Sequence, residues 1–209
     1  MKYLFNTHQI ALYFLWLLYF TSPLIAEDKP DCQVCEGIFN LRTQNQVDQF
    51  DCTIVTGTIR LDSRPGADPI VNLLALEKLE EITGDLIISE QWELSGLQGL
   101  NNLQRIGGSL KIESDRKLKN LKGLERLKEV GAHLSILLND RLFSINGLDS
   151  LQSVHGNLNI QSNDNLVMIN SLNQLQQVGG SLSISQNLAL KSIDNFPALK
   201  TIGAGLVLI

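Results

Sequence analysis

Aromatic residues and cysteines are scarce in this sequence of 209 residues, and it has no excess of positive charge. Phe, Trp and Tyr make up only 6% of the chain, so we expect an interior of stacked aliphatic side chains. The formal net charge is −5, whereas a nucleic-acid-binding domain usually carries a basic stripe, so nucleic acid is not an expected partner. With 44% hydrophobic and 19% charged residues, the composition is typical of a globular chain and not of a disordered one.

Long apolar runs are also missing, apart from residues 10–20 near the start of the chain. This run follows the positive charge of Lys2, is broken at residues 21–23, and precedes a small residue, Ala26, that suits cleavage. Eleven residues of helix span only about 16 Å, which is too short for a hydrocarbon core of about 30 Å. Residues 1–26 are therefore predicted to be a cleaved signal peptide, which would place the protein outside the cell or on its surface.

An internal repeat of 24 residues organises the chain beyond its first quarter. Residues 83–202 divide without gaps into five such units, a sixth begins at Gly203, and a longer, less regular unit occupies residues 56–82. Aliphatic residues two apart share one face of a strand, and they recur at the fourth and sixth positions of each unit. The fourth position holds Leu86, Leu110, Leu134, Leu158, Leu182 and Leu206; the sixth holds Ile88, Ile112, Ile136, Ile160, Ile184 and Leu208.

After each predicted strand, aliphatic residues recur every three positions, as in Leu118, Leu121, Leu124, Leu127 and Val130. A strict period of three drifts around the axis of an α-helix, but it fits a polygonal coil that turns one side chain inward from each face. Stacked units bury what a single unit leaves exposed. The sequence therefore predicts a mainly β fold over residues 53–209, a parallel β-solenoid of about seven coils with leucine-rich-like repeats and little helix.

One polar column also follows the repeat. The ninth position holds Gln91, Asp115, Asn139, Asn163 and Asn187. Stacked Asn side chains hydrogen-bond the backbone of turns in their own and neighbouring coils. We expect this column to be a ladder that stabilises the turns.

Residues 27–52 are predicted to close the open end of the solenoid. Thr43, followed by a short polar segment, is typical of the N-cap of a helix. The apolar residues expected to face the first coil are Ile38, Leu41, Val47 and Phe50.

All three cysteines, Cys32, Cys35 and Cys52, lie in this N-terminal cap. Behind a signal peptide they indicate a disulfide, with Cys52 paired to either Cys32 or Cys35. The first two also form a C-x-x-C motif, but a zinc site needs about four ligands and no nearby histidine or second motif supplies them. We therefore expect neither a metal nor another cofactor.

Residues 52–61 (CTIVTGTIRL), preceded by a cysteine-bearing helix, resemble the opening of a receptor L domain. The later spacing of aliphatic residues, as in residues 124–136, is similar to the body of that family. These domains form half of the ligand-binding arms of insulin-type and epidermal-growth-factor-type receptors, and similar modules occur in lipid-anchored fungal cell-wall proteins. The resemblance covers roughly residues 32–209. It implies a right-handed parallel β-helix used for recognition and not for catalysis.

The sequence departs from those receptors in having no second L domain, cysteine-rich linker, kinase or lipid-anchor signal. It ends at residues 205–209 within a predicted strand, with no capping element. Because an exposed apolar strand end favours pairing, we expect either a truncated fragment or self-association through the last coil.

Seven residues on the outward face of the predicted strands and at one adjoining turn are candidates for partner binding. Ile87 and Leu137 are apolar on a polar face, and Trp92 belongs to a residue type that is enriched among interface anchors. The simpler interpretation is a solvated sheet, with the tryptophan packed over a coil edge. The full set is Asp85, Ile87, Trp92, Lys111, His133, Leu137 and Asn159.

Together these features predict a secreted or cell-surface recognition module that binds a protein or glycan partner. One alternative is a structural component of a wall or matrix, and another is a β-helix enzyme that degrades polysaccharides. Such an enzyme needs converging carboxylates, but the acids expected on the sheet are only Asp85 and Glu113, one coil apart and in different columns. No catalytic residue is therefore predicted.

Overall fold

The structure is a computed structural model that describes residues 33–63, 68–193 and 196–208. The predicted signal peptide and Cys32 lie outside the described residues. The part that can be described is almost entirely β, and none of its helices is long and apolar enough to cross a membrane.

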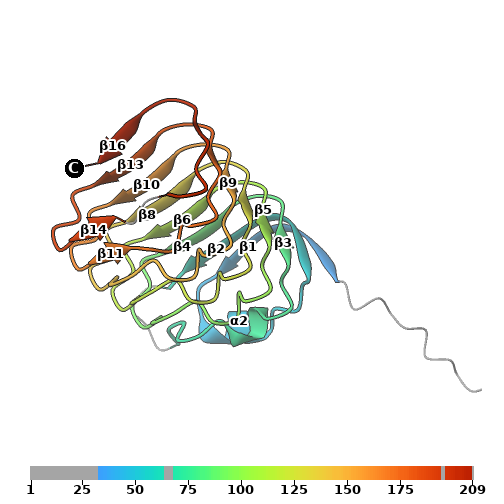
Figure 1. The fold of residues 1–209 in the computed structure, drawn as a ribbon. Helices are drawn as coiled ribbons and strands as arrows, with labels where there is room; N and C mark the ends of the chain where they lie inside the picture. The colour runs from blue at the N-terminus through green and yellow to red at the C-terminus, as the bar shows by residue number, and fades with distance from the viewer. Residues whose placement is uncertain (1–32, 64–67, 194–195, 209) are drawn as a thin grey trace, which may run out of the picture. The chain divides into compact units, whose positions relative to one another are not determined.

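The main sheet is a stack of short parallel strands, one from each successive coil (Figure 1). Leu110 pairs with Leu134, and Leu134 pairs with Leu158, so residues 24 apart lie side by side as the repeat predicts. Between the first two coils the step is 27 residues, because Ile59 pairs with Leu86. The strands are β2 (Ile54–Asp62), β4 (Leu86–Ser89), β6 (Leu110–Glu113), β8 (Leu134–Leu137), β10 (Leu158–Gln161), β13 (Leu182–Ser185) and β16 (Leu206–Leu208).

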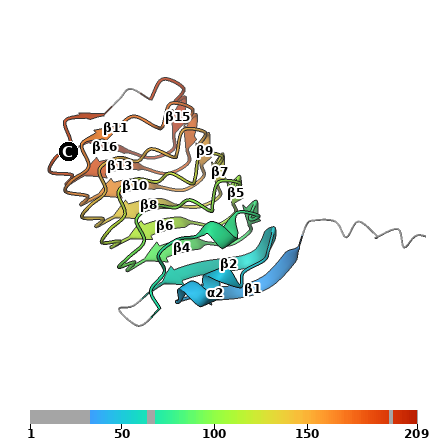
Figure 2. The ribbon, with the colours of Figure 1, turned by 90° about the horizontal axis from the view of Figure 1, so that it is seen from below.

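Shorter strands lie on two other faces of the solenoid, one of which carries them in only two of the described coils. The long strand β2 joins the first of these stacks to the main sheet, because its residue Val55 pairs with Ile82. The stack consists of β3 (Glu81–Ile82), β5 (Arg105–Ile106), β7 (Glu129–Val130), β9 (Ser153–Val154), β12 (Gln177–Val178) and β15 (Thr201–Ile202); the other face carries β11 (Met168–Ile169) and β14 (Ser192–Ile193). Figure 2 shows the coils following one another along the stack. The prediction of a parallel β-solenoid of about seven coils is confirmed.

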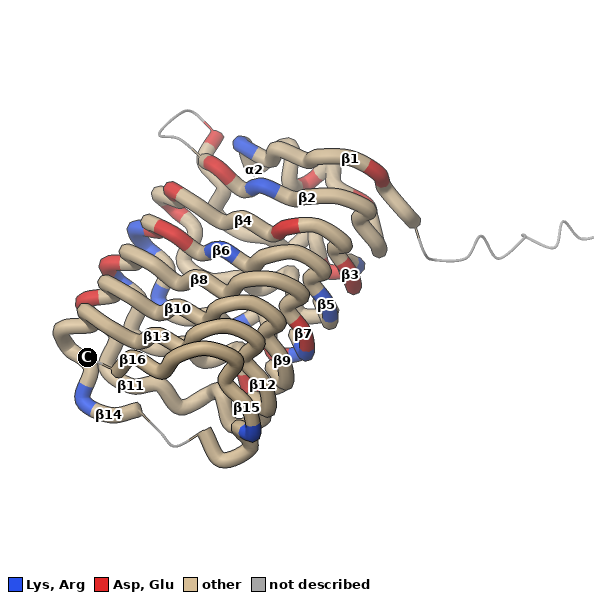
Figure 3. The backbone as a smooth tube through the Cα atoms, turned by 90° about the horizontal axis from the view of Figure 1, so that it is seen from above, with Lys and Arg blue, Asp and Glu red and all other residues tan. Residues whose placement is uncertain are grey.

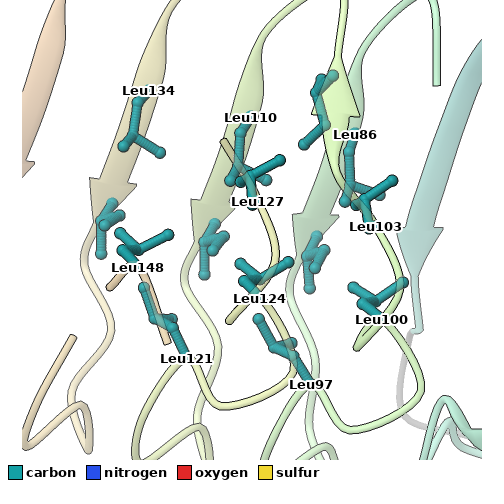
Figure 4. Close-up of a cluster of buried hydrophobic side chains, with 14 of the residues drawn as sticks. Leu86, Leu97, Leu100, Leu103, Leu110, Leu121, Leu124, Leu127, Leu134 and Leu148 are labelled. Atoms are coloured by element: carbon teal, nitrogen blue, oxygen red, sulfur yellow. The ribbon is translucent and has the colours of Figure 1, made fainter. Parts of the chain in front are cut away.

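Aliphatic columns fill the interior between these faces. Leu97 and Leu121 lie side by side in successive coils, as do Leu100, Leu124 and Leu148, and all five are fully buried (Figure 4). Burying one such side chain is worth roughly 1.5–3 kcal/mol, and each coil contributes several of them. The stack is therefore held together mainly by contacts between neighbouring coils.

In three successive coils, close contact between turns requires glycine at one position. Gly99, Gly123 and Gly147 have φ values of 114° to 120°, a backbone conformation that other residues rarely adopt. A Cβ atom on Gly123 would lie 2.0 Å from the carbonyl oxygen of Leu97. In the next unit Ser171 takes this place, and its hydroxyl donates to the carbonyl of Ile145 at 2.7 Å.

The polar ninth column forms the predicted ladder. The backbone N–H of Asn139 donates to Oδ1 of Asn163 at 3.1 Å, and the N–H of Asn163 donates to Oδ1 of Asn187 at 3.0 Å. The side-chain amide of Asn139 also donates to the carbonyl of Ile112, so the side chain of each Asn ties its own coil to the preceding one. The preceding residue of each unit is left-handed, with φ between 53° and 60°.

The N-terminal end differs in part from the prediction. An unpredicted strand, β1 (Val34–Leu41), pairs in parallel with β2, and the short α2 (Gln44–Asp48) follows, with the Thr43 hydroxyl accepting from the N–H of Gln46. The inward placement of Ile38 was wrong, because alternation along β1 turns this side chain outward and leaves it 66% exposed. A 3₁₀ turn (Leu74–Leu76) is the other helical segment among the described residues.

Phe50 is buried at this end, and Phe39 packs against it edge to face at 5.4 Å between ring centroids. A disulfide joins Cys35 of β1 to Cys52, just before β2, with 5.9 Å between the Cα atoms. Of the two partners left open for Cys52, the structure selects Cys35.

Candidate recognition surfaces

Two columns of side chains face outward along the main sheet. They occupy the fifth and seventh positions of each unit, and the strand register sets their members side by side. Apart from the exposed Arg60, all are half-buried. One column consists of Arg60, Ile87, Lys111, Ser135, Asn159 and Ser183, and the other of Asp62, Ser89, Glu113, Leu137, Gln161 and Ser185.

Four of the predicted binding residues lie on this sheet, but not as one cluster. Ile87 and Lys111 are direct neighbours in one column, whereas Leu137 lies in the other column, two strands away from Ile87. Two strand spacings amount to about 10 Å, so the apolar residues do not form a single patch. In Figure 3 charged residues lie on β2 and β6, whereas β8, β10 and β13 carry none.

Asn159 stands out on the uncharged half of the sheet. Its Oδ1 is buried and has no hydrogen-bond partner among the described residues. Ser135 and Ser183 flank it on the neighbouring strands. Because this oxygen is covered by the protein, its missing partner is not evidence for a ligand at Asn159.

Asp85 and His133 occupy the third position of their units and stabilise the stack. Oδ1 of Asp85 accepts the N–H of Ser109 at 2.7 Å, and Nδ1 of His133 accepts the N–H of Asn157 at 3.0 Å. Asn157 in turn accepts the N–H of Ser181 at 2.9 Å. This second ladder was not predicted. Every side chain at the third position carries a hydrogen-bond acceptor, and this recurrence in the sequence could have indicated it.

Trp92 is half-buried at the turn that follows β4. The guanidinium carbon of Arg116, one coil further on, lies 3.7 Å from its ring centroid. Such stacking is a cation–π contact, so the indole packs over the edge of the neighbouring coil. Its role in binding a partner stays a prediction, as does that of the six other candidates.

Exposed ion pairs line the face that carries β3, β5 and β7. Arg105 contacts Glu81 at 2.8 Å and Glu129 at 3.6 Å, and Glu129 also lies 3.3 Å from His155. Because these groups are a third to a half exposed, each pair contributes little to stability. Because these opposite charges neutralise one another, this face has no strong preference for an anionic or a cationic ligand.

Residues 51–131 and 151–207 match the family described as Receptor L domain. The chain belongs to the receptor L-domain family. Receptor L domains are non-catalytic modules that bind ligands in receptors, which fits a recognition role for this chain. No curated protein and no solved structure matches the chain.

This L domain has a second candidate surface, on the face that carries β11 and β14. A hollow of about 650 Å³ opens there between neighbouring turns. Its lining includes Lys119, Lys122, Arg141, Phe143, Asn146 and Asn165. Sequence reasoning missed this site because it considered only the outward residues of the strands and one adjoining turn.

Metal ligands are not clustered in the described part of the L domain. No group of three His, Cys, Asp or Glu side chains there is placed to hold a metal ion. The one acid with a clearly perturbed pKa is Asp115, and burial raises that pKa well above its ordinary value. Asp115 belongs to the buried ladder and does not reach the surface, so it is not a candidate for chemistry on a ligand.

Proposed function

We propose that this L domain is a secreted or cell-surface recognition module that binds a protein or glycan partner through the outward face of its main sheet. The observation that carries the proposal is the register of strands β2 to β13. It sets two columns of half-buried side chains on one rigid surface. Solenoids use extended surfaces of this kind to bind their partners.

Two further observations support the proposal. The disulfide between Cys35 and Cys52 is typical of proteins that fold in an oxidising compartment. The acids Asp85 and Glu113 lie on different strands and in different columns, and Asp85 is engaged by the backbone of the next coil. Asp62 and Glu113 share a column but are separated by Ser89, so no two of these acids are direct neighbours on the sheet, and binding is the better supported role.

The test is a double variant, Ile87→Asp with Leu137→Asp, screened against immobilised cell-surface proteins and glycans. Wild type identifies the binders, and we expect the variant to bind them at least about tenfold more weakly, because each change places an unpaired charge in the contact. Circular dichroism checks that both proteins fold alike.

A matched control carries the same change of charge on another face. Gln104→Asp with Gln152→Asp alters two exposed residues beside β5 and β9. This control should bind like wild type. If the sheet variant also binds like wild type, the main sheet is not the binding surface.

A further inference from the structure

The hollow beside β11 is basic, partly aromatic, and separate from the sheet. We propose that it binds an anionic saccharide, that is, a sugar ring that carries a carboxylate or a sulfate group. Lys119, Lys122 and Arg141 would hold the anionic group, and Phe143 would lie against the ring. The site is independent of the partner proposed for the sheet.

Backbone hydrogen bonds fix the position of the hollow. The N–H of Phe143 donates to the carbonyl of Lys119 at 2.9 Å, and the N–H of Val167 donates to the carbonyl of Phe143 at 3.2 Å. Three successive coils thus place their turns side by side, and side chains from each of them line the hollow. A volume of about 650 Å³ is typical of sites for small organic ligands, and it exceeds what a single inorganic anion needs.

The charge of the hollow is unbalanced. No aspartate or glutamate lines it, and Lys119, Lys122 and Arg141 form no ion pair with any described residue. Lys117, just outside, is paired with Glu93. Three neighbouring cations repel one another, and an anionic ligand would relieve this repulsion, with the guanidinium able to hold a carboxylate or sulfate through two parallel hydrogen bonds.

Phe143 and two amides extend the recognition beyond charge. The phenyl ring is 56% exposed, at a position where the neighbouring coils have Lys119 and Val167. The amide of Asn146 offers a donor and an acceptor, and that of Asn165, which donates one hydrogen to the carbonyl of Asp140, keeps its second hydrogen and its oxygen; both suit the hydroxyl groups of a sugar. An aromatic face, paired amides and cations together match a molecule that has an apolar ring face, hydroxyl groups and an acid.

An acidic peptide fits the hollow less well. Peptides often bind by adding a strand to free backbone groups, but here the N–H groups of Phe143 and Ser144 both donate to the carbonyl of Lys119. The N–H of Lys122 donates to Oδ1 of Asn120 at 3.1 Å. Since the turns satisfy these groups internally, only side chains remain for recognition, and a saccharide uses them more fully.

Calorimetric titration of the full chain tests the proposal with four probes. They are a galacturonic acid trimer, a sulfated galactose trimer, a neutral galactose trimer and a short glutamate peptide. We expect at least one acidic saccharide to bind at least about tenfold more tightly than the neutral trimer and the peptide, and to weaken as salt screens the charges. Comparison of the two acidic probes shows whether the anion is a carboxylate or a sulfate.

Two variants locate the site, and two controls accompany them. Lys119→Gln with Arg141→Gln should weaken binding of the acidic saccharide at least about tenfold, and Phe143→Ser should weaken it while leaving the charge intact. The matched control Lys117→Gln removes a nearby cation outside the hollow and should leave the affinity unchanged. The sheet variant, Ile87→Asp with Leu137→Asp, should also leave this affinity unchanged. Failure of the proposal for the sheet can then be told apart from failure of the proposal for the hollow.

Several results would overturn the inference. Equal binding of acidic and neutral trimers would remove the role of charge, and tighter binding of the peptide would assign the hollow to acidic proteins instead. Equal losses in the Lys119–Arg141 variant and in the Lys117 control would show non-specific attraction. If neither acidic saccharide binds, the hollow is not a site for anionic saccharides.

Discussion

The two ends of the described stack present the same aliphatic columns to different surroundings. At the first end, Ile59 and Leu61 of β2 are fully buried, because β1 and the residues around α2 cover them. In the last described coil Leu206 is 54% exposed and Leu208 is 46% exposed. Their counterparts one coil earlier, Leu182 and Ile184, are almost fully buried.

The difference shows how short the range of these interactions is. Leu182 and Leu206 are the same residue type at the same position of the repeat, and they are paired in register. A single further coil beyond Leu182 is enough to bury it completely. Stability in this protein is therefore expected to be a sum of coil and nearest-neighbour contributions, as in other repeat proteins.

The largest effect should come from forcing two inner coils apart. Gly123→Ala places a Cβ atom 2.0 Å from the carbonyl oxygen of Leu97, at a φ of 119° that alanine rarely adopts. The turn must move and disturb both coils, so we expect the free energy of unfolding to fall by about 3–5 kcal/mol. Urea denaturation followed by circular dichroism measures this loss.

The same substitution in the last described coil provides the control. At Gly205 an added Cβ would have its nearest neighbour, the hydroxyl oxygen of Ser181, at 3.9 Å, which is ordinary contact. Gly205→Ala should therefore change the free energy of unfolding by less than about 1 kcal/mol. Similar losses for the two variants would mean that neither the contact with Leu97 nor the positive φ decides the cost at Gly123.

A second, smaller effect compares the two leucines directly. Leu182→Ala leaves a cavity in a fully buried column and should destabilise the protein by about 2–5 kcal/mol. Leu206→Ala removes a half-exposed side chain and should cost less than about 1.5 kcal/mol. Both losses are obtained from urea denaturation at several protein concentrations.

A large loss for Leu206→Ala would contradict this comparison. If that loss also grew with protein concentration, another chain would be covering the last coil in solution. The self-association predicted from the sequence would then be supported, and the exposed leucines would be its contact surface.

Most of the fold was accessible from the sequence because the repeat is strict. Leu110, Leu134 and Leu158 lie in register as the 24-residue spacing predicted, and the ninth-position ladder formed where stacked amides were expected. The N-terminal end was less accessible. It lies outside the repeat, so no column showed that residues 34–41 form a strand, and Ile38 was placed inward when it faces out.

The candidate sites were harder to predict, for physical reasons. The position of a residue on the sheet follows from strand alternation, but whether its side chain is free depends on the next coil. Asp85 and His133 are engaged in this way by backbone N–H groups. The basic hollow arises from three turns whose charges are unremarkable in sequence and gather only when the coils stack.

The smallest effect concerns Asp115, the one acid in the buried ladder. Asn139 and Asn163 each donate a side-chain N–H to a carbonyl 27 residues earlier, at 3.0 and 2.9 Å. The same step leads from Asp115 to the carbonyl of Ile88, but a carboxylate has no hydrogen to donate. Its Oδ2 is buried and unpartnered among the described residues, and burial raises the pKa of Asp115 well above its ordinary value.

Asp115→Asn restores the missing donor and should stabilise the protein by about 1–2 kcal/mol at neutral pH. The gain should shrink towards pH 4, because the protonated acid can itself donate to the carbonyl. Above the unfolded pKa of about 3.9 the unfolded chain releases a proton that the folded chain retains, so wild type loses stability as pH rises towards the folded pKa. Urea denaturation of both proteins between pH 4 and neutrality measures the difference, and a gain that does not depend on pH would show that Asp115 is ionised in the folded protein throughout this range.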